Sequence, residues 1–320
     1  MKNWVRCLSA ALLIAAGAVY AQSFPSRPVR IISPYAAGST VDIMCRIISP
    51  KLTASLGQQV IIENRAGAGG AIGMEATARS PKDGYTIMLA ASGFTVIPSL
   101  NPRLTWDPVK DFSAIAQVAT SPLVMVVHPN VAAKNLAELI ALAKAQPGKL
   151  RYGHAGIGSS QHMAGELFSL EAGIDIVNVP YKGGKESLSD LLGDRIEMSV
   201  QGVPAVLPQI RSGAVRAIFL TGPKRSATLP DLPTIGEAGL PKATANVWFG
   251  LLAPAGTPRP IIERLNADII ALMKSVDVIE GFVNGGSEVA TGTPEEFARM
   301  IREDVVTWAK VIKQRGIKVE

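Results

Sequence analysis

The sequence alternates short apolar runs with helix-like stretches, and this alternation constrains the fold more than any other feature. Several runs have the length and the β-branched content of buried strands: VRIISPY, QVIIEN, YTIMLA, LVMVVH, IVNVPY, IEMSVQ and VRAIFLT. Patterns of helical periodicity that end at glycine or proline lie among them, namely TVDIMCRIISPKLTASLG, NLAELIALAKAQPG and AGELFSLEAG. Strands that alternate with helices form α/β structures, so we expect largely parallel sheets covered by helices.

The first residues have the pattern of a secretory signal peptide. Lys2 and Arg6 form a basic start, an apolar stretch follows, and VYA at residues 19–21 resembles a cleavage site. A membrane anchor is the alternative, but the apolar stretch is too short to cross about 30 Å of hydrocarbon. We therefore expect residues 1–21 to be removed on export, a mature chain that begins at Gln22, and a location in the periplasm.

The composition of the mature chain excludes several classes of protein. Removal of the signal peptide takes away Cys7 and leaves Cys45 alone, so no disulfide can form within the chain. The whole chain has 32 basic and 26 acidic residues, and the removal of Lys2 and Arg6 leaves the basic residues in small excess. Only 5% of the residues are aromatic. No basic run is present, so a nucleic-acid surface is not indicated, whereas a small anion suits the mild positive charge. A hydrophobic fraction of 48% in a chain of this length is enough for two domains.

Two proline-rich stretches, TSPLVMVVHPN and WFGLLAPAGTP, flank the middle of the chain. If that middle segment is one compact unit, residues 123–249 form a second lobe inserted into a first lobe of residues 22–122 and 250–320. Two crossing strands then act as a hinge, and two lobes joined by a hinge close over a cleft. Amphipathic helices expected at residues 260–275 and 294–316 pack onto the first lobe.

Two turns rich in small residues recur about 120 residues apart, each after a strand-like run and before a helix-like one: YAAGSTVD, residues 35–42, and HAGIGSSQH, residues 154–162. The first amides of a helix have no partner within it and carry about half a positive charge, so they bind carboxylate or phosphate. Glycine at positions 38 and 158 lets the backbone approach a ligand, and hydroxyl groups at positions 39, 40, 159 and 160 add donors. We interpret the pair as a device that could grip the two ends of a dicarboxylate, with amides near Gly38 to Thr40 or Gly158 to Ser160 as donors.

Each turn also has a plain structural interpretation. Serine and threonine cap helices in many proteins, so either turn alone is an ordinary connection between a strand and a helix. Asp42 in the first helical turn can satisfy the helix dipole, or it can pair with an ammonium or hydroxyl group of a ligand. The occurrence of two such turns in one exported chain favours binding.

Catalysis is the competing class of function. A serine hydrolase would need Ser159 or Ser160, His162 as the base and a distant acid, yet neither turn matches the G-x-S-x-G elbow. A metal site could draw on His154, His162 and Glu166, but no further ligands cluster with them. The segment GAGGAIG has the wrong spacing for a dinucleotide fingerprint, and GGKES lacks the hydroxyl residue of a phosphate loop. We therefore expect no catalytic residues, no metal and no cofactor, with an exported hydrolase as the alternative.

Several segments together resemble the periplasmic solute-binding receptors of tripartite tricarboxylate transporters, the Bug family. From about Phe24 onward they cover nearly the whole mature chain: YAAGSTVDIMCR, VIIENRAGAGGAIG, SPKDGYTIMLA, WDPVKDFSAIAQVA, HAGIGSSQHMAGELF, VPYKGGKESLSDLLGDRIEM and WFGLLAPAGTP. The resemblance implies a type II periplasmic-binding fold, two α/β lobes with a hinge and an interlobe cleft that closes on a small carboxylated solute. It implies a monomeric, non-enzymatic receptor that delivers its solute to membrane transporter subunits, and a sensor kinase is the alternative partner.

The resemblance places the solute on the strand-turn-helix elements of both lobes. Ser39 departs from the family pattern, which commonly has a second glycine there, and Gln201 lies at a candidate specificity position. Aliphatic dicarboxylates, tricarboxylates, acidic amino acids and aromatic acids all fit a cleft of backbone donors. The expected ligand-binding residues are Tyr35, Ala36, Ala37, Gly38, Ser39, Thr40, Asp42, Ser92 and Gly93 in the first lobe, and Ala155, Gly156, Gly158, Ser159, Ser160, His162, Tyr181 and Gln201 in the second.

Overall fold

The computed structural model describes residues 24–35, 37–181, 183–284 and 286–318. The expected signal peptide and one expected ligand-binding residue, Ala36, lie outside these described residues. Within the described ranges, no helix combines the length and the hydropathy that a membrane span requires.

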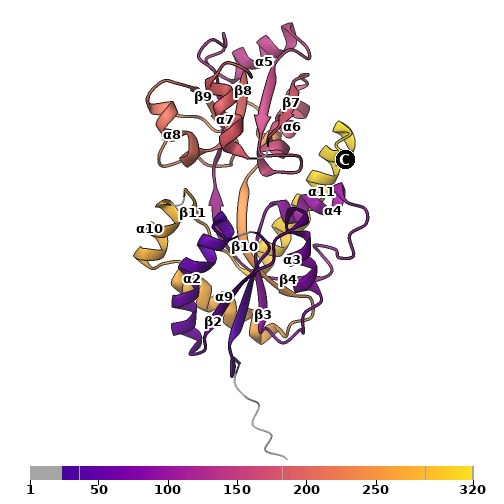
Figure 1. Ribbon diagram of the computed structural model, residues 1–320, viewed down its shortest axis with the longest axis vertical. Helices are drawn as coiled ribbons and strands as arrows, with labels where there is room; N and C mark the ends of the chain where they lie inside the picture. Colours follow the sequence, from indigo (N-terminus) through magenta and orange to yellow (C-terminus); the bar gives the residue numbers. More distant parts are fainter. Residues whose placement is uncertain (1–23, 36, 182, 285, 319–320) are drawn as a thin grey trace, which may run out of the picture.

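Two sheets form the centres of two lobes, which lie one above the other in Figure 1. The first sheet contains β1 (Val29–Ser33), β2 (Val60–Asn64), β3 (Thr86–Ala91), β4 (Phe112–Ser121), β10 (Val247–Pro254) and β11 (Glu288–Val289), in the order β11-β4-β10-β3-β1-β2. The second sheet contains β5 (Leu123–Val127), β6 (Arg151–His154), β7 (Val177–Pro180), β8 (Met198–Gly202) and β9 (Arg216–Leu220), in the order β7-β6-β8-β5-β9.

Helices pack around both sheets. The first lobe carries η1 (Ala68–Gly70), α2 (Thr40–Leu56), α3 (Ala71–Ala78), α4 (Gly93–Leu100), α9 (Arg259–Leu272), α10 (Val276–Asn284) and α11 (Pro294–Arg315). The second lobe carries α5 (Leu136–Ala145), α6 (Ser160–Ala172), α7 (Gly184–Leu192), α8 (Val203–Arg211) and η2 (Pro241–Ala243). The helices expected at residues 260–275 and 294–316 correspond to α9 and α11, whereas the short α10 between them was not expected.

The strand-like runs of the sequence are confirmed as strands, but the expectation of largely parallel sheets is wrong. β1 pairs in parallel with β2 and β3, and β6 pairs in parallel with β7 and β8. β10 runs antiparallel to β3 and β4, and β5 runs antiparallel to β8 and β9. The reason lies in the connection between the lobes. A chain that leaves a sheet through one strand and returns through another must run through it in both directions.

The chain crosses between the two sheets twice. β4 of the first sheet is followed, after Pro122, by β5 of the second, and β10 brings the chain back. The two crossing segments pair with each other, with Val247 opposite Ser121. A third link is non-covalent: α11 packs on α6, and the Arg315 guanidinium at the end of α11 donates to Glu166 Oε2 of α6 at 2.6 Å.

The buried core is continuous across the boundary between the lobes. One cluster of buried apolar side chains includes Ile31 of the first sheet and Phe219 of the second. Met163 of α6 and Trp308 of α11 belong to the same cluster, and both line a small void between the lobes. Burial of apolar surface contributes about 25 cal/mol per Å². The lobes therefore share a packed contact beside the crossing strands.

Candidate functional site

The first turn joins β1 to α2 and is closed by its own side chains. Ser39 caps the helix, because its Oγ accepts a hydrogen bond from the Asp42 amide at 3.2 Å. Gly38 has φ +80°, a conformation that favours glycine. The Gly38 amide donates to Asp42 Oδ2 at 2.9 Å, so a donor that could face a ligand is occupied within the turn.

Asp42 is a buried carboxylate with several donors around it. Besides the Gly38 amide, Arg46 donates from Nε and Nη2 at 2.9 and 3.1 Å, and Asn64 Nδ2 donates at 2.9 Å. The Asp42 side chain is 1% exposed. Its hydrogen bond with Arg46 lowers the pKa of Asp42 to about 2, so the carboxyl is ionised at neutral pH. In this structure the Asp42 carboxylate therefore stabilises the turn to which it belongs.

The second turn joins β6 to α6 and repeats this construction with a histidine. Ser159 Oγ accepts from the His162 amide at 3.2 Å, and Gly158 has φ +77°. The Gly158 amide donates to His162 Nδ1 at 3.1 Å. We call the contact of Gly38 with Asp42, and of Gly158 with His162, the brace of each turn. Burial, followed by the neighbouring His154 ring, lowers the pKa of His162 to about 4, so the imidazole is neutral at pH 7.

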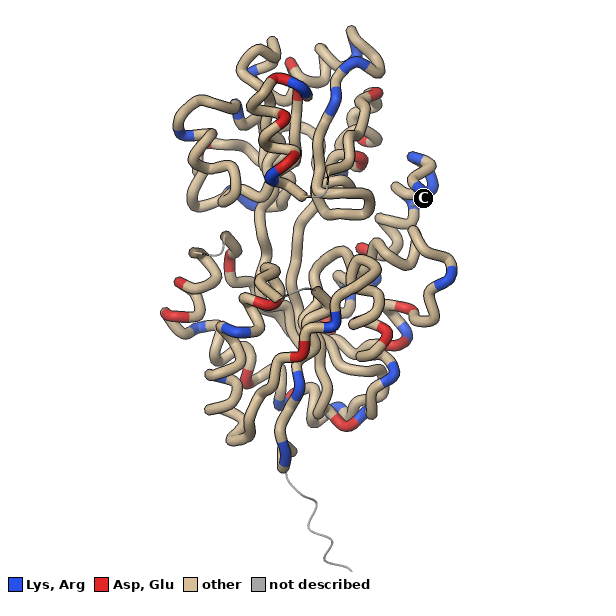
Figure 2. The backbone as a smooth tube through the Cα atoms, viewed as in Figure 1, with Lys and Arg blue, Asp and Glu red and all other residues tan. Residues whose placement is uncertain are grey.

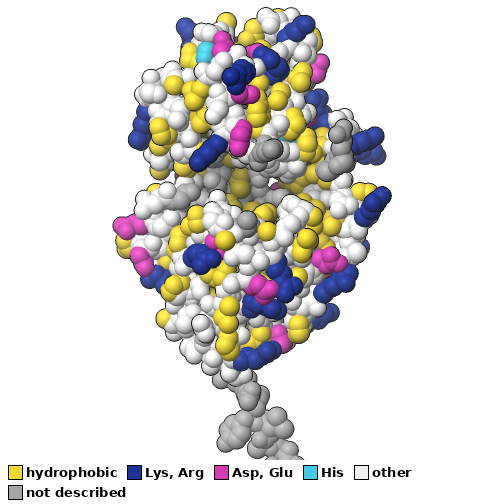
Figure 3. All heavy atoms as spheres, in the orientation of Figure 1, with side chains coloured by type: hydrophobic (Ala, Val, Ile, Leu, Met, Phe, Trp, Pro, Cys, Tyr) yellow, Lys and Arg dark blue, Asp and Glu magenta, His cyan; other side chains and the backbone are white. Residues whose placement is uncertain are grey.

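Several contacts join the second turn to the first lobe. Ser92 Oγ, directly after β3, lies 2.9 Å from Ser160 Oγ at the start of α6. A Cβ placed on Gly158 would lie 2.6 Å from Leu100 Cδ1 of α4. Ser92 and Ser160 also line the small void between the lobes. Figure 3 shows the surface hollowed along the boundary between the two lobes.

Tyr35 links the first turn to the same boundary. A Cβ placed on Gly93 would lie 3.8 Å from Tyr35 Oη, and a Cβ on Gly70 would lie 3.2 Å from Tyr35 Cε1. Burial raises the pKa of the Tyr35 hydroxyl to about 12, so this hydroxyl is a neutral donor and acceptor at pH 7. The structure therefore brings Tyr35, Ser92 and Gly93 together on the first-lobe side, with Ser160 opposite.

Tyr181 and Gln201 lie in the second lobe, where their polar groups already have partners. Tyr181 Oη donates to Asp190 Oδ2 at 2.8 Å. Gln201 is 1% exposed, and its Nε2 donates to Ser199 Oγ at 2.7 Å and to the Gly184 carbonyl at 3.1 Å. These donors support the second lobe itself. Of the other expected residues, Ala37, Gly38 and Thr40 are exposed, and Ser39, Ala155, Gly156 and Ser159 are half-buried.

Asp304 of α11 carries a half-buried carboxyl group and was not among the expected site residues. Its Oδ2 accepts from Trp248 Nε1 of β10 at 2.6 Å. Burial raises the pKa of Asp304 to about 6. The available signal was its position four residues before Trp308, on the face of the helix that turns toward the core.

The hydroxyl groups and the histidine of the second turn do not form a pair of nucleophile and base. His162 Nδ1 accepts from the Gly158 amide, Ser159 Oγ accepts from the His162 amide, and Ser160 Oγ is bonded to Ser92. No group of three or more potential ligands for a metal occurs in the part of the chain that the structure describes.

Charged residues of both signs are spread over both lobes in Figure 2.

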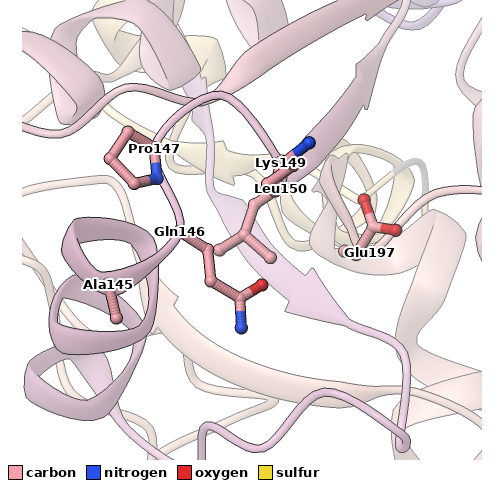
Figure 4. A pocket seen from close by; sticks show the side chains of 6 residues that line it. All are labelled: Ala145, Gln146, Pro147, Lys149, Leu150 and Glu197. Carbon is pink, nitrogen blue, oxygen red and sulfur yellow. The ribbon is translucent and has the colours of Figure 1, made fainter.

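A surface pocket beside the end of α5 lies apart from the two turns (Figure 4). Glu197 is its acidic residue, and Arg151 already donates to that carboxylate from its amide, Nε and Nη2 at 2.7, 3.1 and 2.7 Å. The charge is therefore compensated. The remaining lining residues are Ala145, Gln146, Pro147, Lys149 and Leu150.

Comparison with known proteins agrees with this architecture. The model of the tripartite tricarboxylate transporter family receptor matches residues 44–317. Protein BugT of Bordetella pertussis is 38% identical over 307 residues, which are 95% of this chain and 94% of that protein. The structure of R. palustris Rpa4515 with adipate has a TM-score of 0.75 at 33% identity, covering 92% of this chain and 99% of that one. The structure of MatC from Rhodopseudomonas palustris with bound malate has a TM-score of 0.72 at 30% identity, covering 90% of this chain and all (100%) of that one. The resemblance seen in the sequence and the two-lobed fold are both confirmed, and the chain belongs to the Bug family of periplasmic solute-binding receptors for tripartite tricarboxylate transporters.

Proposed function

We propose that this receptor captures a small carboxylated solute between its lobes and delivers it to a tripartite tricarboxylate-type transporter in the membrane. One observation carries the proposal: two turns of the same construction lie in two lobes that meet at one boundary and are joined by two crossing strands. Relatives solved with adipate and malate support a dicarboxylate as the class of solute.

The proposed donors to the solute are those amides of the two turns that take no part in the brace contacts. The Gly38 and Gly158 amides already donate to Asp42 and His162. Thr40 and Ser160 begin α2 and α6, and the first amides of a helix have no partner within it. A charged hydrogen bond contributes about 1.5 to 3 kcal/mol. The proposal therefore moves the main donors from the two glycines to Thr40 and Ser160, with Tyr35 and Ser92 beside them.

Further parts of the proposal concern the whole receptor. We propose export, removal of residues 1–21 and a mature chain that begins at Gln22 in the periplasm. The inserted second lobe would comprise residues 123–249, and the first lobe residues 22–122 and 250–320. The receptor would act as a monomer without enzymatic activity, and a sensor kinase is the alternative to the transporter as its partner.

Native mass spectrometry followed by calorimetric titration tests the proposal. The mass of a copurifying acid would identify the solute class, and titration of refolded protein with adipate, malate, citrate, glutamate and benzoate would rank the classes. We expect one class to bind with a stoichiometry of one. Product formation from ester or amide substrates would instead support the exported hydrolase.

Proline substitution at the first helical position removes one proposed donor with little other change. Ser159 has φ −65° and ψ 156°, a conformation that a following proline accepts, and proline is favoured at this helical position. Ser160→Pro should therefore fold and bind the solute about ten- to a hundredfold more weakly than the matched Ser160→Ala control. Ser39 has φ −68° and ψ 160°, so Thr40→Pro tests the first turn in the same way. If both folded proline variants bind like the parent, the solute is held elsewhere.

A further inference from the structure

Two stacked histidines lie behind the second turn and contact its two ends. The ring centroids of His154 and His162 are 4.4 Å apart, and the planes differ by 29°. The two side chains are buried, with exposed fractions of 0% and 1%. His154 Nδ1 lies 3.0 Å from the Gly156 carbonyl oxygen, and His162 Nδ1 accepts from the Gly158 amide at 3.1 Å.

These contacts determine where the proton of each neutral ring lies. A carbonyl oxygen can only accept, so His154 must carry its proton on Nδ1. A backbone amide can only donate, so His162 must lack a proton on Nδ1 and carry it on Nε2. Neither Nε2 atom has a hydrogen-bond partner within 3.5 Å among the described residues, and the nearby Asn178 Nδ2 donates instead to Glu166 Oε1 at 3.3 Å. The two rings therefore have opposite tautomers, each imposed by the backbone of the same turn.

The charged groups around the pair are compensated. Glu166, one helical turn after His162 on α6, has its Oε1 3.7 Å from His162 Nε2. Tyr152 of β6 donates to the same Oε1 at 2.6 Å, and Arg315 of α11 donates to Oε2 at 2.6 Å. Burial lowers the pKa of both His154 and His162. With the Glu166 charge held by Arg315, the surroundings favour two neutral rings at pH 7.

We propose that His162 is a positioning residue of the solute site, which fixes the second turn by accepting the Gly158 amide while His154 fixes the other end of the turn at Gly156. Asp42 has the same relation to Gly38 in the first turn. His162 thus aligns the amide of Ser160 and does not itself contact the solute. The role of His162 in a solute site rests on the proposed function, but the brace is a property of the unliganded protein and can be tested without any ligand.

Hydrogen exchange of the unliganded protein measures the brace directly. His162→Leu removes the acceptor, so the peptide that contains Gly158 should exchange about tenfold faster. His162→Asn supplies a side-chain oxygen like the one with which Asp42 accepts the Gly38 amide in the first turn, so this variant should restore slow exchange. The first turn is the internal control and should not change. Equal exchange in parent and His162→Leu would overturn the proposal, and so would an equal acceleration of both turns, which would mean that His162 supports the whole fold.

Nitrogen NMR of the histidine rings tests the same proposal on the parent protein and does not depend on a variant that folds. The chain has three histidines, so His128 serves as the reference. We expect a bare Nδ1 on His162 and a protonated Nδ1 on His154, unchanged between pH 8 and pH 6. The same tautomer on both rings, or a charged His162 at pH 7, would overturn the proposal.

Discussion

Alanine at Gly158 should disturb the contact between the lobes, whereas alanine at Gly38 should not. Both glycines have nearly the same backbone conformation, with φ +77° and +80°. A Cβ at position 38 would meet no atom within 4 Å, but a Cβ at position 158 would lie 2.6 Å from Leu100 Cδ1 in the opposite lobe. Comparison of the two variants therefore separates the energetic cost of the left-handed backbone conformation from the cost of crowding Leu100 across the boundary between the lobes.

The magnitudes follow from these two terms. A left-handed conformation costs a residue with a Cβ about 1 to 2 kcal/mol, so Gly38→Ala should lower the free energy of unfolding by that amount. The Leu100 methyl group would have to move by about 1 Å, and because it is the end of a half-buried side chain, this overpacking costs about 1 kcal/mol, the low end of the range for protein cores. Gly158→Ala should therefore be about 1 kcal/mol less stable than Gly38→Ala.

Urea unfolding of the unliganded variants, followed by fluorescence and circular dichroism together, gives the comparison. The double variant Gly158→Ala/Leu100→Ala should show a favourable coupling of up to about 1 kcal/mol, because the shortened side chain makes room for the new methyl group. Equal stability of the two glycine variants together with zero coupling would refute the contact between Gly158 and Leu100 in solution.

Three further predictions concern buried and half-buried polar groups. The pKa of Asp42 is lowered to about 2, so its carboxylate stabilises the fold above pH 4, and this contribution is lost as the pH falls through 2. Asp42→Asn should therefore lower the free energy of unfolding by about 2 kcal/mol at pH 7, measured by urea unfolding, and change it little at pH 2. The pKa of Asp304 is raised to about 6, so ionisation opposes folding as the pH rises through 6; Asp304→Asn should raise the melting temperature at pH 8 and not at pH 4. Ser92 and Ser160 share a hydrogen bond across the lobes, and a double-mutant cycle with alanine should give a coupling of about 1 kcal/mol, whereas zero coupling would contradict the contact.

Seven strands could be predicted because each is a short apolar run between turn residues, whereas β4, β6, β10 and β11 were not among these runs. VRIIS became β1 and LVMVV became β5, since residues of this kind are buried on both faces of a covered sheet. Direction could not be predicted in the same way. β10 and β5 run against their neighbours because the chain passes between two lobes, and the apolar pattern of a strand is the same in either direction.

The position of the two turns could be predicted, but the use of their donors could not. In both turns serine is the N-cap, and the residue three positions later, Asp42 or His162, reaches back over the turn. That spacing is visible in the sequence. The state of His162 depends on burial and on Glu166, whose partner Arg315 lies 149 residues further along the chain. No local pattern contains that contact.

The ion pair between Arg315 and Glu166 limits how the lobes can move. Glu166 is 2% exposed, and removal of one partner from a buried ion pair costs about 3 to 5 kcal/mol. A motion that keeps this pair leaves the lobes linked in two places, at the crossing strands and at the end of α11. Gly286, which follows α10, packs against Pro204 of α8, and its carbonyl oxygen accepts from Ser121 Oγ of the first crossing segment at 3.1 Å. We therefore expect Gly286 and Pro204 to part little when the lobes open, because they lie beside the crossing strands, and the entrance for the solute to widen away from them.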